Sequence, residues 1–295
     1  MLAKQNDADQ DGRCTALRLS ALVCVAMLCF AGNSILCRLA LKGAHIDPAS
    51  FTLLRMSSGA AMLYILLGVT GAGAPVRGSW RGAFALILYA ITFSFAYVRM
   101  EAGTGALLLF GAVQLSMILY GMLKGERLSL AGTAGLLLGI SGLVYLLLPG
   151  GSAPPLGSAA LMIVAGASWG WYSILGKGVA DPLAETTGNF LRAVPFALAC
   201  ALPFLAVLNT DLEGAMYAVL SGAVASGMGY ALWYGAMREL SVLKASTVQL
   251  SVPVISVLAG IALLDEILTL RIVAACALVL GGIAIVLVSR QRRAA

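Results

Sequence analysis

The chain has 295 residues, of which 60% are hydrophobic and 11% are charged, and its mean hydropathy is +0.95. Soluble globular domains carry about 25% charged residues, so this composition excludes a soluble protein and predicts an integral membrane protein. The formal net charge of +6 is expected to reside in loops that contact lipid headgroups, and we infer no nucleic-acid partner.

Apolar runs of about 20 residues recur along the chain, each long enough to cross a hydrocarbon core of about 30 Å as a helix. Before the first run, residues 1–16 form a tail; its polar part, residues 1–12, is expected to be disordered and not a signal peptide. A second short tail is predicted at residues 291–295. The fold class expected is all-α, with ten spans at residues 17–41, 48–69, 82–100, 104–122, 130–148, 156–177, 184–208, 214–237, 245–264 and 272–289.

Several short motifs recur about half the chain apart. Ser-Ile-Leu at residues 34–36 returns at 173–175, and Glu126-Arg127-Leu128 is echoed by Glu266-Ile267-Leu268. The order of these echoes is conserved, which favours internal duplication. Five spans per half is an odd number, so the second half must enter the membrane from the opposite side. We therefore predict two inverted five-helix repeats, at residues 17–150 and 151–290.

Lysine and arginine residues are concentrated in the loops on one side of the predicted topology. That side holds both termini, which predicts cytoplasmic termini. The short loops leave no room for a soluble domain.

Groups suited to catalysis are scarce in the predicted spans. The only histidine, His45, falls in a loop, and no His, Cys, Asp and Glu set has metal-ligand spacing. We expect no catalytic residue, no metal ion and no cofactor, and hence no enzyme. No Asp or Glu lies near the middle of a span, which disfavours direct proton coupling.

Two arginines, Arg55 and Arg192, lie inside spans at matching positions of the two halves. An arginine at the bilayer centre costs about 2.5–3.5 kcal/mol on the insertion scale, so such residues tend to face protein or water. Two interpretations remain open. Each arginine could bind a substrate carboxylate, or each could have a structural role and extend towards the interface.

The middle of the spans is where a transporter of this symmetry binds its substrate. Helical spacing puts Trp169 and Tyr172 on one face of the sixth span, and their repeat counterparts lie on the first span. Aromatic faces with a few polar groups suit a small amphipathic solute, although each aromatic could instead be a core or interfacial residue. The candidate substrate-binding residues are Trp169, Tyr172, Asn33, Ser34, Phe30, Gln114, Phe110, Tyr89, Tyr230, Trp233, Ser251 and Arg55.

Glycines at close-packing spacing mark the fifth and tenth spans, at Gly132, Gly135, Gly139, Gly142, Gly281 and Gly282. These spans could pack against each other or form a dimer face. We favour the internal contact, and with it a monomer.

The stretch from Trp169 to Tyr172 and the loop motifs at Glu126 and Glu266 resemble the EamA-type branch of the drug/metabolite transporter superfamily. The resemblance implies that the first, third, fourth, sixth, eighth and ninth spans line a central cavity, with the fifth and tenth outside. Within this superfamily the chain is similar to bacterial aromatic amino-acid exporters of the YddG type. It departs from them at Val113-Gln114, where they carry an aromatic residue and proline.

The function expected is a facilitative, alternating-access exporter of small neutral amino acids, mainly hydrophobic or aromatic, in a bacterial inner membrane. Its partners would be the small-molecule substrate and membrane lipid. An exporter of organic cations or another small metabolite is the alternative, with the cation held by aromatic faces. An intramembrane enzyme would need a reactive constellation that the sequence lacks.

Overall fold

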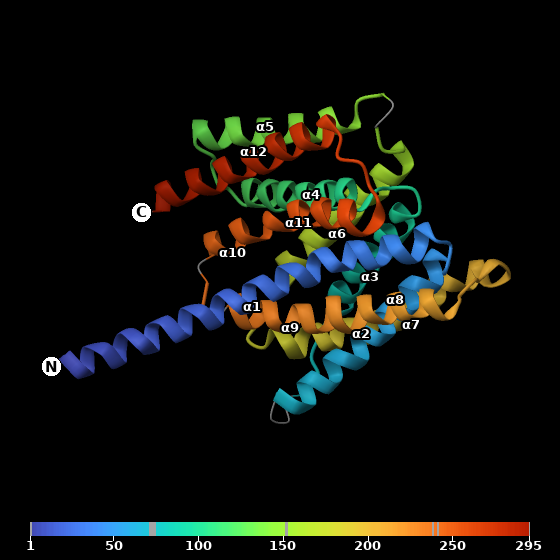
Figure 1. Ribbon diagram of the computed structural model, residues 1–295, viewed down its shortest axis with the longest axis horizontal. Coiled ribbons are helices and arrows are strands. Elements are labelled where there is room, and N and C mark those ends of the chain that lie inside the picture. Colours follow the sequence, from blue (N-terminus) through green and yellow to red (C-terminus); the bar gives the residue numbers. More distant parts are fainter. Residues whose placement is uncertain (1, 71–74, 151–152, 238, 241, 295) are drawn as a thin grey trace.

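The structure is a computed structural model that describes residues 2–70, 75–150, 153–237, 239–240 and 242–294. In these residues the chain is helical, and one isolated bridge joins Ile46 to Thr210. The first half comprises α1 (Leu2–Lys42), α2 (Pro48–Thr70), α3 (Trp80–Tyr97), α4 (Ala102–Leu123) and α5 (Leu130–Leu147). The helices run along one common direction, and both termini lie at the same end of the bundle (Figure 1). We call this end the terminal end and the other the far end.

The second half contains more breaks than the first. Its elements are α6 (Leu156–Leu175), α7 (Pro182–Ala201), the 3₁₀ helix η1 (Leu202–Val207), α8 (Leu212–Leu220), the π-helix η2 (Ser221–Met228), α9 (Gly229–Met237), α10 (Val242–Gln249), α11 (Ser251–Leu264) and α12 (Leu270–Ala294). The predicted eighth span is therefore α8, η2 and α9 in succession, and the ninth is α10 and α11.

Among the described residues, nine helical segments are long and apolar enough to cross a membrane. The predicted all-α integral membrane fold is confirmed. The count of ten spans stays a prediction, because α7 is not among the nine. Glu185, Arg192 and Asn189 lower its hydropathy, and it ends at Ala201, before the predicted boundary at residue 208.

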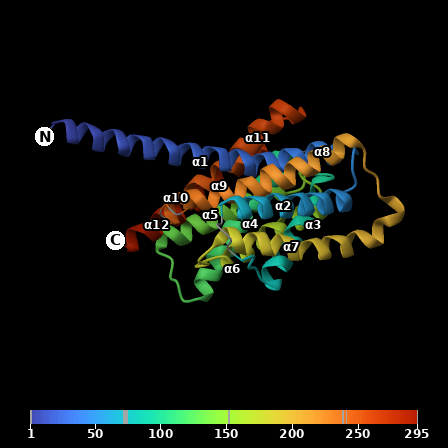
Figure 2. The same cartoon turned by 90° about the horizontal axis from the view of Figure 1, so that it is seen from below.

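The expectation of a disordered segment at residues 1–12 differs from the structure over residues 2–12, which are helical; residue 1 lies outside the described residues. Helix α1 begins at Leu2 and continues into the first span without a break, extending beyond the bundle at the terminal end (Figures 1 and 2). The segment contains no proline, and most of its residues tolerate helix. Propagation from an existing helix also avoids the cost of nucleation.

Side-chain caps fix the start of several helices. Ser79, Ser129, Asp181 and Asp211 each accept a hydrogen bond from the backbone N–H three residues later, at the starts of α3, α5, α7 and α8. Such a cap satisfies one of the free N–H groups of the first turn. All four caps follow short loops, so they help to define the ends of the bundle.

The ninth predicted span breaks three residues before a proline, Pro253. Pro253 lacks an N–H group and cannot donate to the carbonyl of Gln249. Helix α10 ends at Gln249 and α11 begins at Ser251. The break therefore falls in the first third of the predicted span 245–264.

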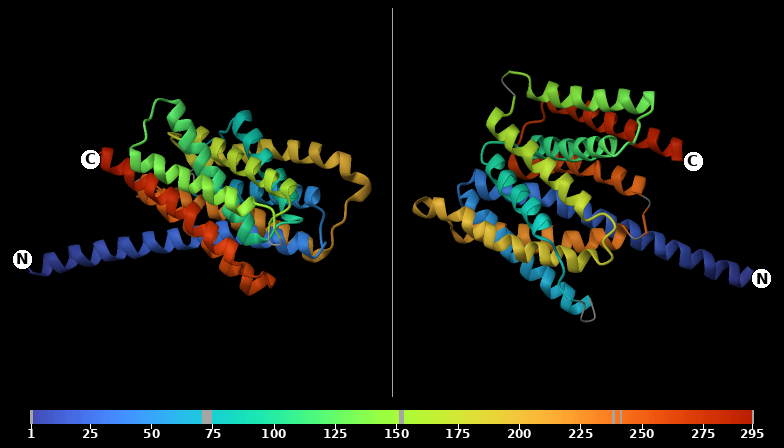
Figure 3. Two further views of the ribbon diagram at one scale, coloured as in Figure 1. Left: turned by 90° about the horizontal axis from the view of Figure 1, so that it is seen from above. Right: turned by 180° about the vertical axis from the view of Figure 1, so that it is seen from behind.

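Helices α5 and α12 pack along their length at one edge of the bundle (Figure 3). Glycines permit this close approach, since a Cβ at Gly135 would lie 2.7 Å from the Gly282 carbonyl oxygen, and one at Gly282 would lie 2.5 Å from that of Gly135. The predicted internal contact between the fifth and tenth spans is confirmed.

Candidate functional site

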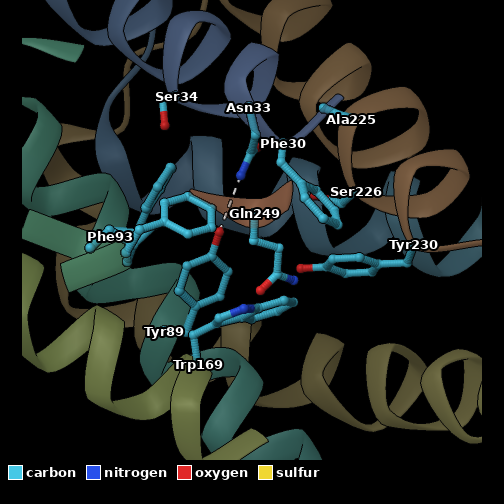
Figure 4. A pocket seen from close by; sticks show the side chains of 12 residues that line it. Phe30, Asn33, Ser34, Tyr89, Phe93, Trp169, Ala225, Ser226, Tyr230 and Gln249 are labelled. Carbon is cyan, nitrogen blue, oxygen red and sulfur yellow. Dashed lines mark hydrogen bonds between the residues drawn. The ribbon is translucent and has the colours of Figure 1, made fainter. Parts of the chain in front are cut away.

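A cavity lies between the two halves, at the depth where the π-helix and the α10–α11 break occur (Figure 4). The space between its atoms is about 430 Å³, the opening included. All six spans expected to surround a central cavity contribute to its walls. The lining residues are Phe30, Asn33 and Ser34 of α1, Tyr89 and Phe93 of α3, Leu109 and Phe110 of α4, Trp169 of α6, Ala225 and Ser226 of η2, Tyr230 of α9 and Gln249 of α10.

Trp169 is the centre of an aromatic wall. Its ring stacks on Tyr230 with centroids 5.1 Å apart and an interplanar angle of 21°, and on Tyr172 at 5.4 Å and 29°. Tyr89 lies against it at 5.0 Å in a tilted arrangement. Offset aromatic pairs at such distances stabilise each other beyond simple burial. The wall therefore presents an ordered π surface to the cavity.

Two glycines of α6 hold Trp169 in this position. A Cβ at Gly166 would lie 2.5 Å from the Leu109 carbonyl oxygen, and one at Gly170 would collide with Ser116. Small residues four apart allow two membrane helices to approach closely. The ring of Trp169 is consequently fixed relative to α4.

The polar end of the cavity is built around the Tyr89 hydroxyl. Its oxygen accepts a hydrogen bond from Asn33 Nδ2 at 3.1 Å (dashed in Figure 4) and another from Arg55 Nη2 at 2.9 Å. Asn33 in turn accepts a bond from Ser221 Oγ at 2.5 Å. This network links α1, α2 and α3 to the π-helix η2.

Arg55 lies in the layer directly behind the cavity wall. Its side chain is only 1% exposed, and its guanidinium carbon lies 4.9 Å from the ring centroid of Phe93 and 5.1 Å from that of Tyr89. Its Nε donates a long bond of 3.4 Å to Ser226 Oγ, and its Nη1 has no partner. No carboxylate in the described part of the chain lies within 4.0 Å of it.

The π-helix η2 packs on α2 at Gly222. A side chain there would collide with the Arg55 carbonyl and with Ser58. π-helical turns are rare and often occur at functional sites. Here the turn brings Ser221 and Ser226 towards the cavity network.

Seven of the predicted binding residues line the cavity together: Phe30, Asn33, Ser34, Tyr89, Phe110, Trp169 and Tyr230. The other five do not line it. Tyr172 lies behind Trp169 and lines a second pocket, where its hydroxyl is 3.4 Å from both Thr186 and Asn189. Trp233 packs against Phe30, with ring centroids 6.0 Å apart.

The remaining three lie close to the cavity without lining it. Gln114 is buried one turn beyond Phe110 on α4. Ser251 donates its hydroxyl to the Val248 carbonyl at 2.7 Å. Arg55 reaches the cavity through Tyr89, as described above.

Five lining residues were not predicted: Phe93, Leu109, Ala225, Ser226 and Gln249. The repeat offset could have identified Gln249, because it is 139 residues after Phe110. Phe93 lies one helical turn after Tyr89. Ala225 and Ser226 gave no signal, because their orientation depends on the π-helix.

Arg192, the repeat counterpart of Arg55, has a different environment. It is half-buried at the terminal end, where its Nη1 donates to the carbonyls of Arg77 at 2.6 Å and Gly188 at 3.0 Å. Trp80 lies 6.0 Å from it. Of the two interpretations made for the pair, Arg192 fits the structural role.

A set of contacts joins α1, α4 and the segment between α11 and α12 at the far end. We call it the Glu266 latch, and its residues are Glu266, Ala102, Gly103, Arg38 and Lys42. The Glu266 carboxylate accepts the N–H groups of Ala102 at 2.7 Å and Gly103 at 3.4 Å and lies 4.0 Å from Arg38 Nε. Lys42 donates to the Leu264 carbonyl at 2.6 Å. A carboxylate at the start of α4 is favoured by the helix dipole.

Comparisons with known proteins place this arrangement in a family. Residues 156–288 match the EamA-like transporter family. An uncharacterised protein of Pseudomonas aeruginosa is 54% identical over 94% of this chain and 97% of its own length. An uncharacterised transporter of Archaeoglobus fulgidus is 29% identical over 71% of this chain and 76% of its own. A probable terminal-alkyne amino-acid exporter of Streptantibioticus cattleyicolor is 27% identical over 63% and 64%.

A solved crystal structure shares the fold, with a TM-score of 0.67 and 20% identity, over 92% of this chain and 97% of the other. The family is one of transporters, and the relatives from Archaeoglobus fulgidus and Streptantibioticus cattleyicolor are named as a transporter and an exporter. Membership in a transporter family implies a small-molecule substrate. By its family match, its relatives and its multi-pass helical fold, this chain is a member of the EamA-like transporter family.

Proposed function

We propose that the protein is a secondary transporter that exports small neutral amino acids, mainly hydrophobic or aromatic, across a bacterial inner membrane. The observation that carries this is the stacked pair of Trp169 and Tyr230, which lines one cavity together with the hydrogen-bonding groups of Asn33 and Tyr89. Such a cavity suits a solute with an apolar body and a polar head. A relative named as an amino-acid exporter supports the same class.

The mechanism proposed is alternating access by two inverted repeats, residues 17–150 and 151–290, in a monomer with cytoplasmic termini. The cavity lies between the two halves, where rocking of one against the other would expose it to either side. The Glu266 latch would hold the far end closed while the terminal end is open.

Transport is proposed to be facilitative. Glu266 of the latch and the neighbouring Glu101 lie at the far end and outside the cavity lining. Burial, and secondarily the charge of Glu266, raises the pKa of Glu101. A proton relay would need a carboxylate within the cavity, and no lining residue supplies one.

The test is uptake of labelled neutral amino acids into proteoliposomes, with and without a pH gradient. Trp169→Ala is compared with the control Trp171→Ala, which also removes an indole ring. Trp171 does not line the cavity; it is 40% exposed and packs against Phe84. We expect saturable uptake that ignores the gradient, is lost in Trp169→Ala and persists in Trp171→Ala. Uptake driven by the gradient would refute the facilitative mechanism.

A second candidate is export of organic cations, favoured by the aromatic faces around the cavity, which attract cations. The buried guanidinium of Arg55 opposes it, because it repels a cation at the polar end. Flux of an organic cation without uptake of any amino acid would establish this alternative in place of the first.

A further inference from the structure

We propose that Arg55, Tyr89 and Asn33 form an anion-recognition end of the cavity, which takes a carboxylate group of the substrate and makes that group a requirement for binding. The inference rests on the proposed function in one respect, that this cavity is the transport site. It goes further by assigning one chemical group of the substrate to named side chains.

The first step concerns the direction of the hydrogen bonds at Tyr89. Both hydrogen-bond partners of the Tyr89 oxygen, Asn33 Nδ2 and Arg55 Nη2, are donors, so this oxygen accepts twice. Its own O–H group is then left to donate. Tyr89 lines the cavity, and its proton is available to an acceptor on the substrate.

The second step concerns charge. A buried arginine is ordinarily paired, because an uncompensated buried charge is strongly destabilising. Arg55 is surrounded by the rings of Phe93 and Tyr89 and by Ser226, all neutral, and its Nη1 donor is unused. A carboxylate that enters the cavity would supply both the missing negative charge and the missing acceptor.

The third step concerns access. The residues between Arg55 and the cavity are Tyr89, Phe93 and Ser226, and the bond to Ser226 is long, at 3.4 Å. The carboxylate first meets the Tyr89 O–H group, whose proton is polarised by the guanidinium behind it. Displacing the weak Ser226 contact lets the guanidinium pair with the carboxylate itself.

Beyond the Tyr89 ring, which packs against Trp169, the cavity has a different character. Trp169 and Tyr230 offer ring faces, and Gln249 offers an amide between them (Figure 4). An ammonium group is accommodated by such faces. The cavity is therefore polarised, with donors at the Arg55 end and π faces at the Trp169 end.

The experiment measures binding to the purified full-length protein by isothermal titration calorimetry. Three probes are compared. L-phenylalanine has both charged groups, its methyl ester has the ammonium group alone, and 3-phenylpropionate has the carboxylate alone. We expect both acids to bind and the ester to bind about tenfold more weakly or worse, because the ester cannot accept the charge-assisted hydrogen bonds that a carboxylate accepts.

Comparing Arg55→Gln with Arg192→Gln distinguishes the specific role of Arg55 from a general effect of removing an arginine. Arg55→Gln should weaken binding of both acids about tenfold or more and should not weaken binding of the ester. Arg192→Gln, the matched control, should leave all three affinities unchanged. Tyr89→Phe keeps the ring and removes only the hydroxyl, so it should also weaken the acids selectively.

Equal affinity of ester and acid in the wild-type protein would overturn the proposal, as would failure of both acids to bind. This comparison needs no variant, so it decides the matter even if Arg55→Gln does not fold. Arg55-dependent binding of 3-phenylpropionate without transport of any amino acid would support the anion site and refute the proposed function. Equal transport of amino acids and their esters would support the proposed function and refute the requirement for a carboxylate.

Discussion

Removing the Glu266 carboxylate should loosen the far end of the protein. The side chain caps the first turn of α4 through Ala102 and Gly103, and it lies near Arg38. Loss of a helix N-cap costs about 1 kcal/mol, and loss of a charge at a helix N-terminus adds about 0.3–1 kcal/mol. Together these give about 1–2 kcal/mol, which shifts an equilibrium about 5- to 30-fold.

The shift can be measured by the labelling rate of Cys37, which is fully buried on α1 next to Arg38. In protein whose other cysteines are replaced by serine, Glu266→Ala should raise the rate of maleimide labelling by this factor. Glu126→Ala is the matched control, because Glu126 is the repeat counterpart and pairs with Arg290 at 3.1 Å, away from Cys37.

An unchanged rate in Glu266→Ala would refute the assignment of Glu266 to closure of the far end. An equal increase in Glu126→Ala would refute it as well, since the effect would then be a general loss of stability.

Three further substitutions test the packing and the surface. Gly282→Leu should lower the free energy of unfolding by about 1–3 kcal/mol, because the added side chain overpacks the contact with α5. Gly281→Leu is the control and should not lower it, because a Cβ at Gly281 meets open space. Equal thermal stability of the two variants would contradict this prediction. Gly166→Leu should push α6 off α4 and abolish saturable uptake, so full retention of uptake would show that Trp169 does not depend on this contact. The bond to Asp211 raises the pKa of His45 above 6.5, so stability from the pair is complete below pH 6.5 and is lost as the pH rises through the raised pKa. His45→Gln should remove that part of the pH dependence of the melting temperature, and an identical pH profile would count against it.

The sequence was sufficient for the large-scale architecture because the membrane constrains it so strongly. Hydropathy located the helices, and glycine spacing identified the α5–α12 contact at Gly135 and Gly282. Helix breaks inside spans were harder. Pro253 explains one of them once the structure is seen, but nothing in the composition of residues 221–228 distinguishes a π-helix from an α-helix.

The candidate site was predicted in part for similar reasons. Helical periodicity grouped Trp169 with Tyr172 on one face. It could not show that Trp169 lines the cavity whereas Tyr172, one turn later, lines a second pocket. The repeat offset treated Arg55 and Arg192 as equivalent. Their environments differ because tertiary neighbours, and not position along a helix, decide whether an arginine meets rings or backbone carbonyls.

The uncompensated charge of Arg55 also has an electrical consequence. Its guanidinium lies inside a membrane-spanning helix, two turns from the start of α2. Moving one elementary charge through the whole field changes the free energy by about 2.3 kcal/mol for each 100 mV. Any tilt of α2 that carries Arg55 along the membrane normal is therefore driven or opposed by the membrane potential, even when the transported molecule has no net charge.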